Sequence, residues 1–226
     1  MVTVEVDPAC VESRLLSGEI SCPSCVSGVL GGWGHARRRA IVGSVVAVRP
    51  RRSRCRGCQA THVLLPVSLL LRRAYLADLI FSALSSAATG SGHRSIGVEL
   101  GIPASTVRGW IRVMTARAGE VRNYLLNIAV AAGVEVSVPK ATGSGCGDVI
   151  AAIDVAQAAL GYRFGGVGPG GSGGLVGAVT GAAVAVAVSG GRLLAPGWPT
   201  GFGVAGATPV ASAVSGGDDR SSDATV

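Results

Sequence analysis

Short stretches near the start of the chain alternate apolar with polar residues or are rich in β-branched residues. Residues 1–6 predict a short strand by alternation, and residues 37–49 predict a second strand because Val and Ile dominate them. Residues 61–65 predict a third strand, which ends at Pro66 because proline cannot donate a ladder hydrogen bond. A helical turn is expected within residues 10–20. The first third of the chain is therefore expected to be a small β-rich unit.

Further along, the hydrophobic spacing becomes helical. In residues 70–88 the apolar side chains fall near one face of a helix. A short helix is expected over residues 94–100, and a longer one over residues 104–118 with a continuation towards residue 132. Residues 148–160 predict one more helix.

The second half of the chain is richer in glycine. Residues 1–118 contain 12 glycines and residues 119–226 contain 23. Residues 165–174 are almost all glycine and residues 215–226 are polar, so neither stretch is expected to hold regular structure. Residues 175–188 are continuously apolar, but these 14 residues are fewer than the roughly 20 that a membrane helix needs. We therefore expect a buried helix or an imperfect strand there, and no membrane insertion.

Charge is distributed unevenly. Residues 1–118 hold 15 basic against 6 acidic residues, a net charge of +9, and residues 119–226 hold 5 against 7, a net charge of −2. Every basic residue except Lys140 is arginine, which suits phosphate and guanine contacts. Codon usage in a GC-rich genome would also raise the arginine content, but it does not explain the clustering. The first half is therefore expected to face a polyanion.

Four of the six cysteines form two Cys-x-x-Cys pairs, Cys22/Cys25 and Cys55/Cys58. Zinc prefers four such ligands in a tetrahedron, and a tight turn lets both thiolates of a pair reach one ion. The 29 residues between the pairs leave room for strands, as in a zinc ribbon, and Gly57 is expected to adopt a positive φ in the second turn. Free thiols, a redox pair, or a mixed site that includes His35 or His62 are the alternatives.

The remaining cysteines, Cys10 and Cys146, are expected to be isolated thiols. The first residues contain no secretory signal, and paired cysteines favour metal over disulfides inside a cell. We therefore expect a cytoplasmic protein that binds Zn²⁺.

Residues 95–112 carry the spacing of a helix-turn-helix element. Gly97 stands where a small residue lets two helices cross closely, Gly101 stands at the turn, and Pro103 suits the start of the second helix. The positions expected to be buried are apolar, namely Ile96, Leu100, Ile102, Val107 and Trp110. The alternative is an ordinary helical hairpin in which the same residues are plain core.

The outward positions of this element are polar or basic, namely Ser105, Thr106, Arg108 and Arg112. The second helix of such an element enters the major groove with its N-terminal residues at base edges. Arg108 is the candidate for a base contact, because arginine pairs bidentately with guanine. Phosphate contacts are expected from Arg112, Arg94, Arg72 and Arg73.

With both cysteine pairs and residues 105–110, Ser-Thr-Val-Arg-Gly-Trp, the chain resembles a group of short bacterial proteins of a domain-of-unknown-function family. These proteins carry an N-terminal zinc ribbon before a helix-turn-helix, and they are similar to the N-terminal modules of insertion-sequence transposases. The resemblance covers about residues 20–120. It implies zinc and DNA binding and no established reaction.

These observations predict a small α+β protein with four parts: a zinc ribbon over residues 1–66, a three-helix helix-turn-helix domain over residues 67–132, a Gly/Ala-rich region of uncertain structure over residues 133–214, and a disordered tail over residues 215–226. The expected function is non-enzymatic binding of double-stranded DNA, by a regulator or a protein derived from a mobile element. No small-molecule substrate is expected, and a homodimer is left open.

Two alternative functions are kept. One is a transposition accessory protein or decayed transposase that recognises element ends, and the other is a membrane-tethered or protein-interaction module. A complete transposase would need three spaced carboxylates for two-metal chemistry. The acidic residues after residue 118 do not show that spacing.

Overall fold

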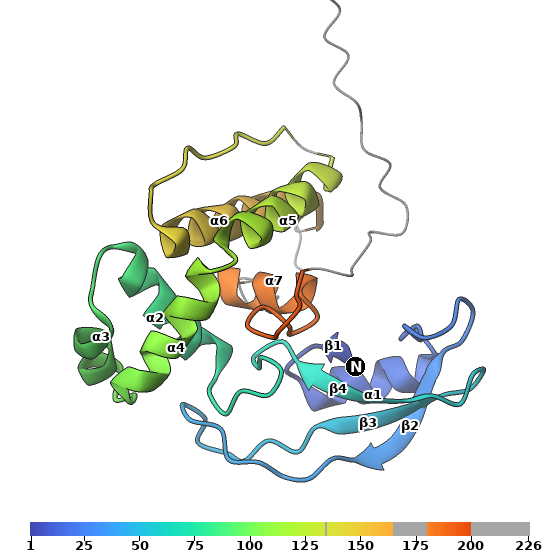
Figure 1. Ribbon diagram of the computed structural model, residues 1–226. Coiled ribbons are helices and arrows are strands. Elements are labelled where there is room, and N and C mark those ends of the chain that lie inside the picture. Colours follow the sequence, from blue (N-terminus) through green and yellow to red (C-terminus); the bar gives the residue numbers. More distant parts are fainter. Residues whose placement is uncertain (134, 165–179, 200–226) are drawn as a thin grey trace, which may run out of the picture.

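The computed structural model describes residues 1–133, 135–164 and 180–199, and it is an α+β protein. A four-stranded sheet lies at one end, and most of the helices are gathered at the other (Figure 1). The elements of the sheet end are β1 (Val2–Val4), α1 (Pro8–Ser17), β2 (Leu30–His35), β3 (Arg51–Cys55) and β4 (Thr61–Pro66). The strand order is β1-β4-β3-β2, with β1 parallel to β4 and the other pairs antiparallel. The strands predicted at residues 1–6 and 61–65 are confirmed as β1 and β4.

The strand predicted over residues 37–49 is wrong. We call residues 36–50 the arm, because they leave the sheet after β2 and return to it at β3. The arm is closed by hydrogen bonds between Ala36 and Pro50 and between Arg39 and Val48. Its β-branched residues are mostly exposed, and Ile41 is the only one that is buried. Because the arm has no neighbouring strand to pair with over its length, β-propensity alone does not produce a strand there.

Six helices follow the sheet: α2 (Ala77–Ala88), α3 (His93–Leu100), α4 (Ala104–Thr115), α5 (Ala118–Ala131), α6 (Gly145–Phe164) and α7 (Gly181–Val188). The start of α2 lies seven residues beyond the predicted residue 70. The amide of Val42 donates to the Ala74 carbonyl and that of Leu76 to the Val42 carbonyl, which holds this stretch extended against the arm. The helix expected to continue to residue 132 is divided, because Arg117 leaves helical geometry with φ −128°.

Helices α2–α7 share one cluster of buried residues, so α6 and α7 pack in the same core as α3 and α4. Helices α5 and α6 lie side by side, and α7 lies between the helices and the sheet (Figure 1). Hydrogen bonds fasten the segment after α7: Leu71 donates its amide to the Gly191 carbonyl, and Arg117 donates to the carbonyls of Ala195 and Trp198.

Part of the apolar stretch 175–188 forms α7, and residues 175–179 lie outside the described residues. The stretches 165–174 and 215–226 also lie outside them. Within the described ranges, no helix combines the length and the apolar character that crossing a membrane requires.

Candidate metal centre and candidate nucleic-acid interface

Four cysteine sulfurs meet at the end of the sheet and could hold a metal ion. The Sγ atoms of Cys22, Cys25, Cys55 and Cys58 all lie within 4.8 Å of one another. Cys22 Sγ lies 3.7 Å from Cys58 Sγ, and Cys25 Sγ lies 3.5 Å from Cys55 Sγ. A tetrahedron with metal–sulfur bonds of about 2.3 Å has edges of about 3.8 Å. The spacing of the thiols therefore matches a four-coordinate metal site, and all four are free of disulfides.

Two tight loops bring the cysteines together. In the first loop the amide of Cys22 donates to the Gly28 carbonyl at 2.7 Å. The second loop follows β3, and the amide of Cys55 donates to the Ala60 carbonyl at 2.9 Å. The amide of Arg56 donates to the Val29 carbonyl and so joins the two loops. These backbone hydrogen bonds thus hold both cysteine pairs together at one end of the sheet without the help of a metal ion.

A glycine that the sequence analysis missed makes room for the sulfurs. A Cβ atom on Gly28 would lie 2.4 Å from Cys55 Sγ and 2.5 Å from Cys25 Sγ, so only glycine fits there. The expectation of a positive φ at Gly57 is wrong, because Gln59 adopts it, with φ 62°. The signal available in the sequence was the position of Gly28, three residues after the first pair.

Hydrogen bonds shift the pKa values of Cys25 and Cys55 in opposite directions. Bonds with Cys55 and then with Cys58 raise the pKa of Cys25 to about 11. Burial opposes ionisation of Cys55, but the amides of Cys58 and Gly57 donate to its sulfur and bring its pKa down to about 6. A thiolate buried among thiols needs a positive partner, and a metal ion at the centre supplies one.

The two histidines considered as ligands are placed differently. Neither belongs to the group of four sulfurs. His35 is exposed at the end of β2. His62 is buried in β4, with its Nε2 atom 3.5 Å from Cys22 Sγ. In the tautomer that carries a proton on Nε2, His62 donates to this sulfur and orients it, as residues behind a metal ligand often do.

The two cysteines outside the pairs lie apart from the cluster. Cys10 is exposed on α1, where its thiol donates to Asp7, and Cys146 is buried on α6. Neither belongs to the group of candidate metal ligands.

Helices α3 and α4 cross closely at Gly97. A Cβ atom there would lie 2.7 Å from the Ile102 carbonyl oxygen, which is backbone and cannot move aside. Gly101 ends α3 in the left-handed conformation with φ 64°, and Pro103 precedes the first turn of α4. The roles expected for Gly97 and Gly101 in the packing of two helices are confirmed.

The apolar side of this helix pair is buried as expected. Ile96, Ile102, Val107 and Trp110 are at most 3% exposed, and Leu100 is half-buried. The Trp110 ring packs edge-on against Tyr75, with 5.0 Å between ring centroids. The position of α4 is therefore tied to the segment that precedes α2.

The predicted DNA-contacting residues fall into two groups. Ser105, Arg108 and Arg112 are exposed at a spacing of three and four residues on α4, which puts them on one face of that helix. Thr106 is half-buried beside them, and Arg94 is exposed in the first turn of α3.

The other two candidates precede α2. Arg72 is exposed with a positive φ of 59°. Arg73 is half-buried and donates through Nη2 to the Leu194 carbonyl at 2.8 Å. Its guanidinium is therefore engaged with the segment after α7.

Comparison of the chain with family models, curated proteins and solved structures finds no match. A function for this protein therefore rests on its own residues and their geometry. Two arrangements described so far are candidates for function: the four sulfurs and the exposed face of α4.

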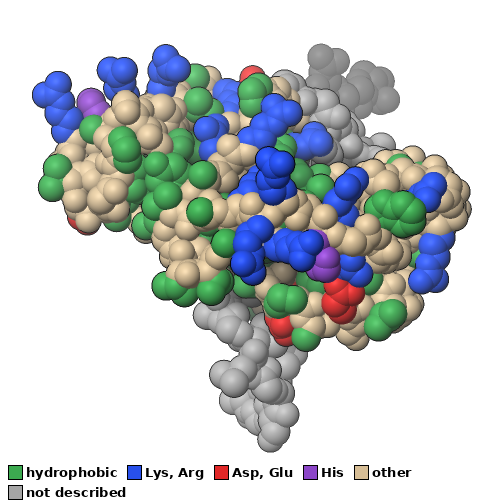
Figure 2. Space-filling model, turned by 90° about the horizontal axis from the view of Figure 1, so that it is seen from below, with side chains coloured by type: hydrophobic (Ala, Val, Ile, Leu, Met, Phe, Trp, Pro, Cys, Tyr) green, Lys and Arg blue, Asp and Glu red, His purple; other side chains and the backbone are tan. Residues whose placement is uncertain are grey.

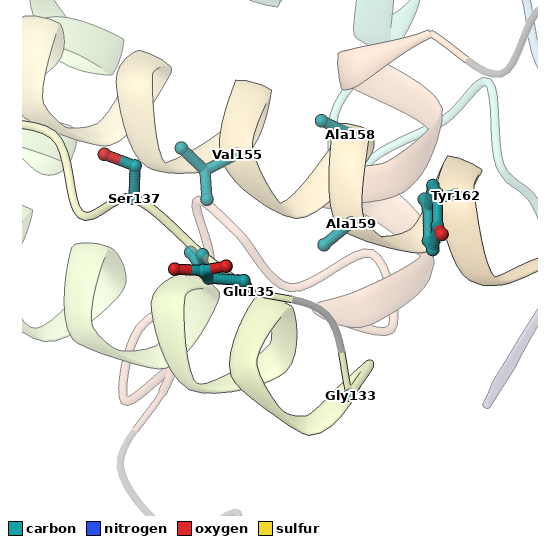
Figure 3. A pocket seen from close by; sticks show the side chains of 8 residues that line it. Gly133, Glu135, Ser137, Val155, Ala158, Ala159 and Tyr162 are labelled. Atoms are coloured by element: carbon teal, nitrogen blue, oxygen red, sulfur yellow. The ribbon is translucent and has the colours of Figure 1, made fainter.

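A hollow of about 710 Å³ lies between α6 and the segment that follows α5. Figure 3 shows Glu135 and Ser137 on one side and the α6 side chains on the other, namely Val155, Ala158, Ala159 and Tyr162. Its lining contains neither histidine nor cysteine. Among the described residues, the four cysteines form the only group of three or more metal-binding side chains, so no carboxylate cluster for two-metal chemistry occurs there.

Proposed function

We propose that this is a zinc-containing helix-turn-helix protein that binds double-stranded DNA and catalyses no reaction. The zinc part is supported by the edge lengths of the sulfur cluster and by the turn at each cysteine pair. Four thiolates in a tetrahedron are typical of structural zinc and of iron–sulfur sites. Structural zinc sites use all four positions, so a Cys₄ site has no open position for a substrate.

Elemental analysis of the purified protein tests the metal. We expect close to one zinc per chain and no stoichiometric iron. Cys22→Ser is expected to lose the metal, whereas Cys10→Ser, which removes an exposed thiol outside the cluster, is expected to keep it. Metal-free protein with an unchanged fold would disprove the zinc proposal.

The observation that carries the DNA proposal is the two-sided character of α4. One side buries Val107, Trp110 and Met114, and the opposite side presents Arg108 and Arg112 to solvent. The residues of α4 include no acid, so nothing on the helix itself would repel a phosphate. A plain helical hairpin needs the buried side but not the basic one.

Different residues of this surface are assigned different roles. Arg108, in the first half of α4, is the candidate for a guanine contact in the major groove. Arg112 and Arg94 are assigned to phosphates, with Ser105 and Thr106 as further polar contacts near the start of α4. We also assign Arg72 to a contact with the phosphate backbone of the DNA. Arg73 would have to release the Leu194 carbonyl before it could reach a phosphate.

Selection of bound sequences from random duplex DNA, followed by titration across a range of salt concentrations, tests this assignment. Wild-type affinity is expected to fall steeply with salt, through counterion release. Arg108→Ala is expected to cost about 1–3 kcal/mol on the selected sequence and less on random DNA. Arg112→Ala is expected to weaken binding to both and to lower the salt slope by about 0.9. Folded, zinc-loaded protein without salt-sensitive affinity would refute the DNA proposal.

A further inference from the structure

The positive charge of the chain is greatest outside the helix pair. Residues 20–77 contain ten arginines and neither aspartate nor glutamate. Four of these arginines lie on the arm, namely Arg37, Arg38, Arg39 and Arg49, and all four are exposed. Figure 2 shows the molecule from below: basic side chains extend from the end that carries α3 and α4 across to the sheet, and acidic ones are few.

Three arm arginines converge on one hollow. Arg37, Arg38 and Arg49 line an open depression of about 490 Å³ together with Ala36. They come from opposite limbs of the arm, which the hydrogen bonds between Arg39 and Val48 hold together. Like charges gathered in this way repel one another, and a bound anion would offset this repulsion.

No acidic side chain within the described residues neutralises these three arginines. Arg51, on the adjoining strand β3, does have an acidic partner, because it pairs with Glu12. Arginine presents several N–H donors in a planar fork that matches the oxygens of a phosphate. The depression therefore has the chemistry of a phosphate site.

The arm is held in a fixed position relative to α4. Val42 exchanges hydrogen bonds with the stretch from Ala74 to Leu76, and Gly43, with φ 91°, approaches Leu79 of α2 so closely that a Cβ would lie 2.6 Å from it. Tyr75 lies within that stretch and packs against Trp110 of α4. A chain of direct contacts thus joins the arm to the helix that presents Arg108.

From this placement we propose that the arm is a second DNA-contacting element. In this arrangement Arg37, Arg38 and Arg49 bind the phosphate backbone of the same duplex whose major groove α4 enters. The inference rests on the proposed function, because it takes duplex DNA as the partner. Its support is the charge complementarity of a surface that is rich in arginine and poor in acidic side chains and that continues to the α3–α4 end (Figure 2). Arms of this kind extend a DNA interface beyond the bases that a recognition helix reads.

The test is fluorescence anisotropy of zinc-loaded protein with labelled duplex DNA across a range of salt concentrations. The R37A/R38A/R49A variant is expected to lose roughly tenfold or more in affinity near 0.1 M salt, and its salt slope is expected to fall by about three. R49A alone is expected to lower the slope by about one. R37K/R38K/R49K, which keeps the charge, is expected to keep most of the slope. K140A, which removes one exposed positive charge elsewhere, is expected to leave both quantities unchanged.

A parallel R108A/R112A variant separates the two proposals. If this variant weakens binding and the arm variant, with unchanged zinc content and circular dichroism, does not, the inference about the arm is overturned while the proposed function stands. If wild-type protein binds no duplex at all, the proposed function fails, and the inference fails with it. If the arm variant loses affinity for single-stranded RNA but not for duplex DNA, the partner assigned to the arm is wrong.

Discussion

The sheet with α1 and the helical part differ in what holds them together. The main cluster under the sheet contains eight buried residues, and two of them are Cys22 and Cys55 of the candidate metal centre. Helices α2–α7 and their flanking segments share a cluster of twenty-nine buried residues. A core as small as the first supplies little free energy, and units of that size usually need a metal or disulfides. The helical part has the larger apolar core, so we expect it to be stabilised mainly by packing.

Because the two regions are held together differently, we expect them to be sensitive to different substitutions. If the cysteines hold a metal, loss of one ligand is expected to unfold the sheet end and to leave the helical core folded. Loss of a buried aromatic residue is expected to destabilise the helical core and to leave the sulfur cluster unchanged. Variants confined to one region therefore show whether the two regions are stabilised independently.

The largest effect is expected from Cys55→Ser. Structural zinc contributes about 10–16 kcal/mol of apparent binding free energy in small zinc peptides, so its loss should unfold the sheet end. Hydrogen exchange should show lost protection in β3 and β4 and retained protection in α5 and α6. Cys10→Ser is the control, because Cys10 is an exposed thiol on α1. Equal loss of protection in both regions would mean that the sheet and the helical part unfold together.

A smaller effect is expected from Trp110→Ala in the helical part. Trp110 is 3% exposed and packs against Tyr75, and truncating a buried aromatic costs about 3–5 kcal/mol in the free energy of unfolding. Trp33→Ala is the matched control, since Trp33 is 51% exposed on β2, where the Arg54 guanidinium lies 4.6 Å from its ring centroid. Denaturant titration of both variants checks the difference. A comparable cost at the two positions would show that burial does not distinguish them.

A pair of glycines tests the crossing of α3 and α4. Gly97→Ala places a Cβ atom 2.7 Å from the Ile102 carbonyl, and overpacking of this kind costs about 1–3 kcal/mol. Gly109→Ala on α4 meets nothing within 4 Å and should stabilise the helix by about 0.5–1 kcal/mol. Thermal unfolding should therefore shift in opposite directions, and metal content should stay the same in both variants. If Gly97→Ala is neutral, the helices can separate more easily than this contact implies.

Features that depend on neighbours in the sequence could be predicted. The cysteine pairs were recognisable because a tight turn brings both thiols to one ion. Gly97 and Gly101 were recognisable because close helix contact and a left-handed turn favour glycine over other residues. The strands β1 and β4 followed from short apolar patterns. In each case a local rule and the tertiary structure agree.

Features that depend on distant partners could not be predicted. Residues 30–35 contain three glycines and no β-branched residue, yet they form β2, because they pair with β3 beside the cysteine loops. Residues 37–49 have the opposite composition and form the arm. Helix α2 begins late because Leu76 is bonded to Val42, and α4 is separated from α5 at Arg117, whose side chain reaches the segment after α7. The need for Gly28 became evident only once the sulfurs were placed.

The smallest effects are expected from two carboxylates on α6. The amide and the hydroxyl of Thr142 donate to Asp148 at 2.6 and 2.9 Å, and this backbone bond above all lowers the pKa of Asp148. Partial loss of solvation raises the pKa of Asp154, although the residue remains exposed overall. A lowered pKa means that the unfolded chain binds protons more readily, so the contribution of Asp148 is complete above its ordinary pKa and is lost as the pH falls through its folded pKa. For Asp154 the sign is reversed, and its charge costs stability above its raised pKa.

The two variants should therefore move the thermal unfolding of the helices in opposite directions at neutral pH. Asp148→Asn removes the charge that Thr142 stabilises and should lower the midpoint, whereas Asp154→Asn removes a poorly solvated charge and should raise it. Both differences should shrink as the pH is lowered through the ordinary carboxyl range, because wild-type protein then becomes neutral at the same positions. Thermal unfolding followed by far-ultraviolet circular dichroism at several pH values measures these differences in midpoint, because the signal comes mainly from the helices. Shifts of the same sign, or shifts that persist in acid, would show that the substitutions act through packing rather than through charge.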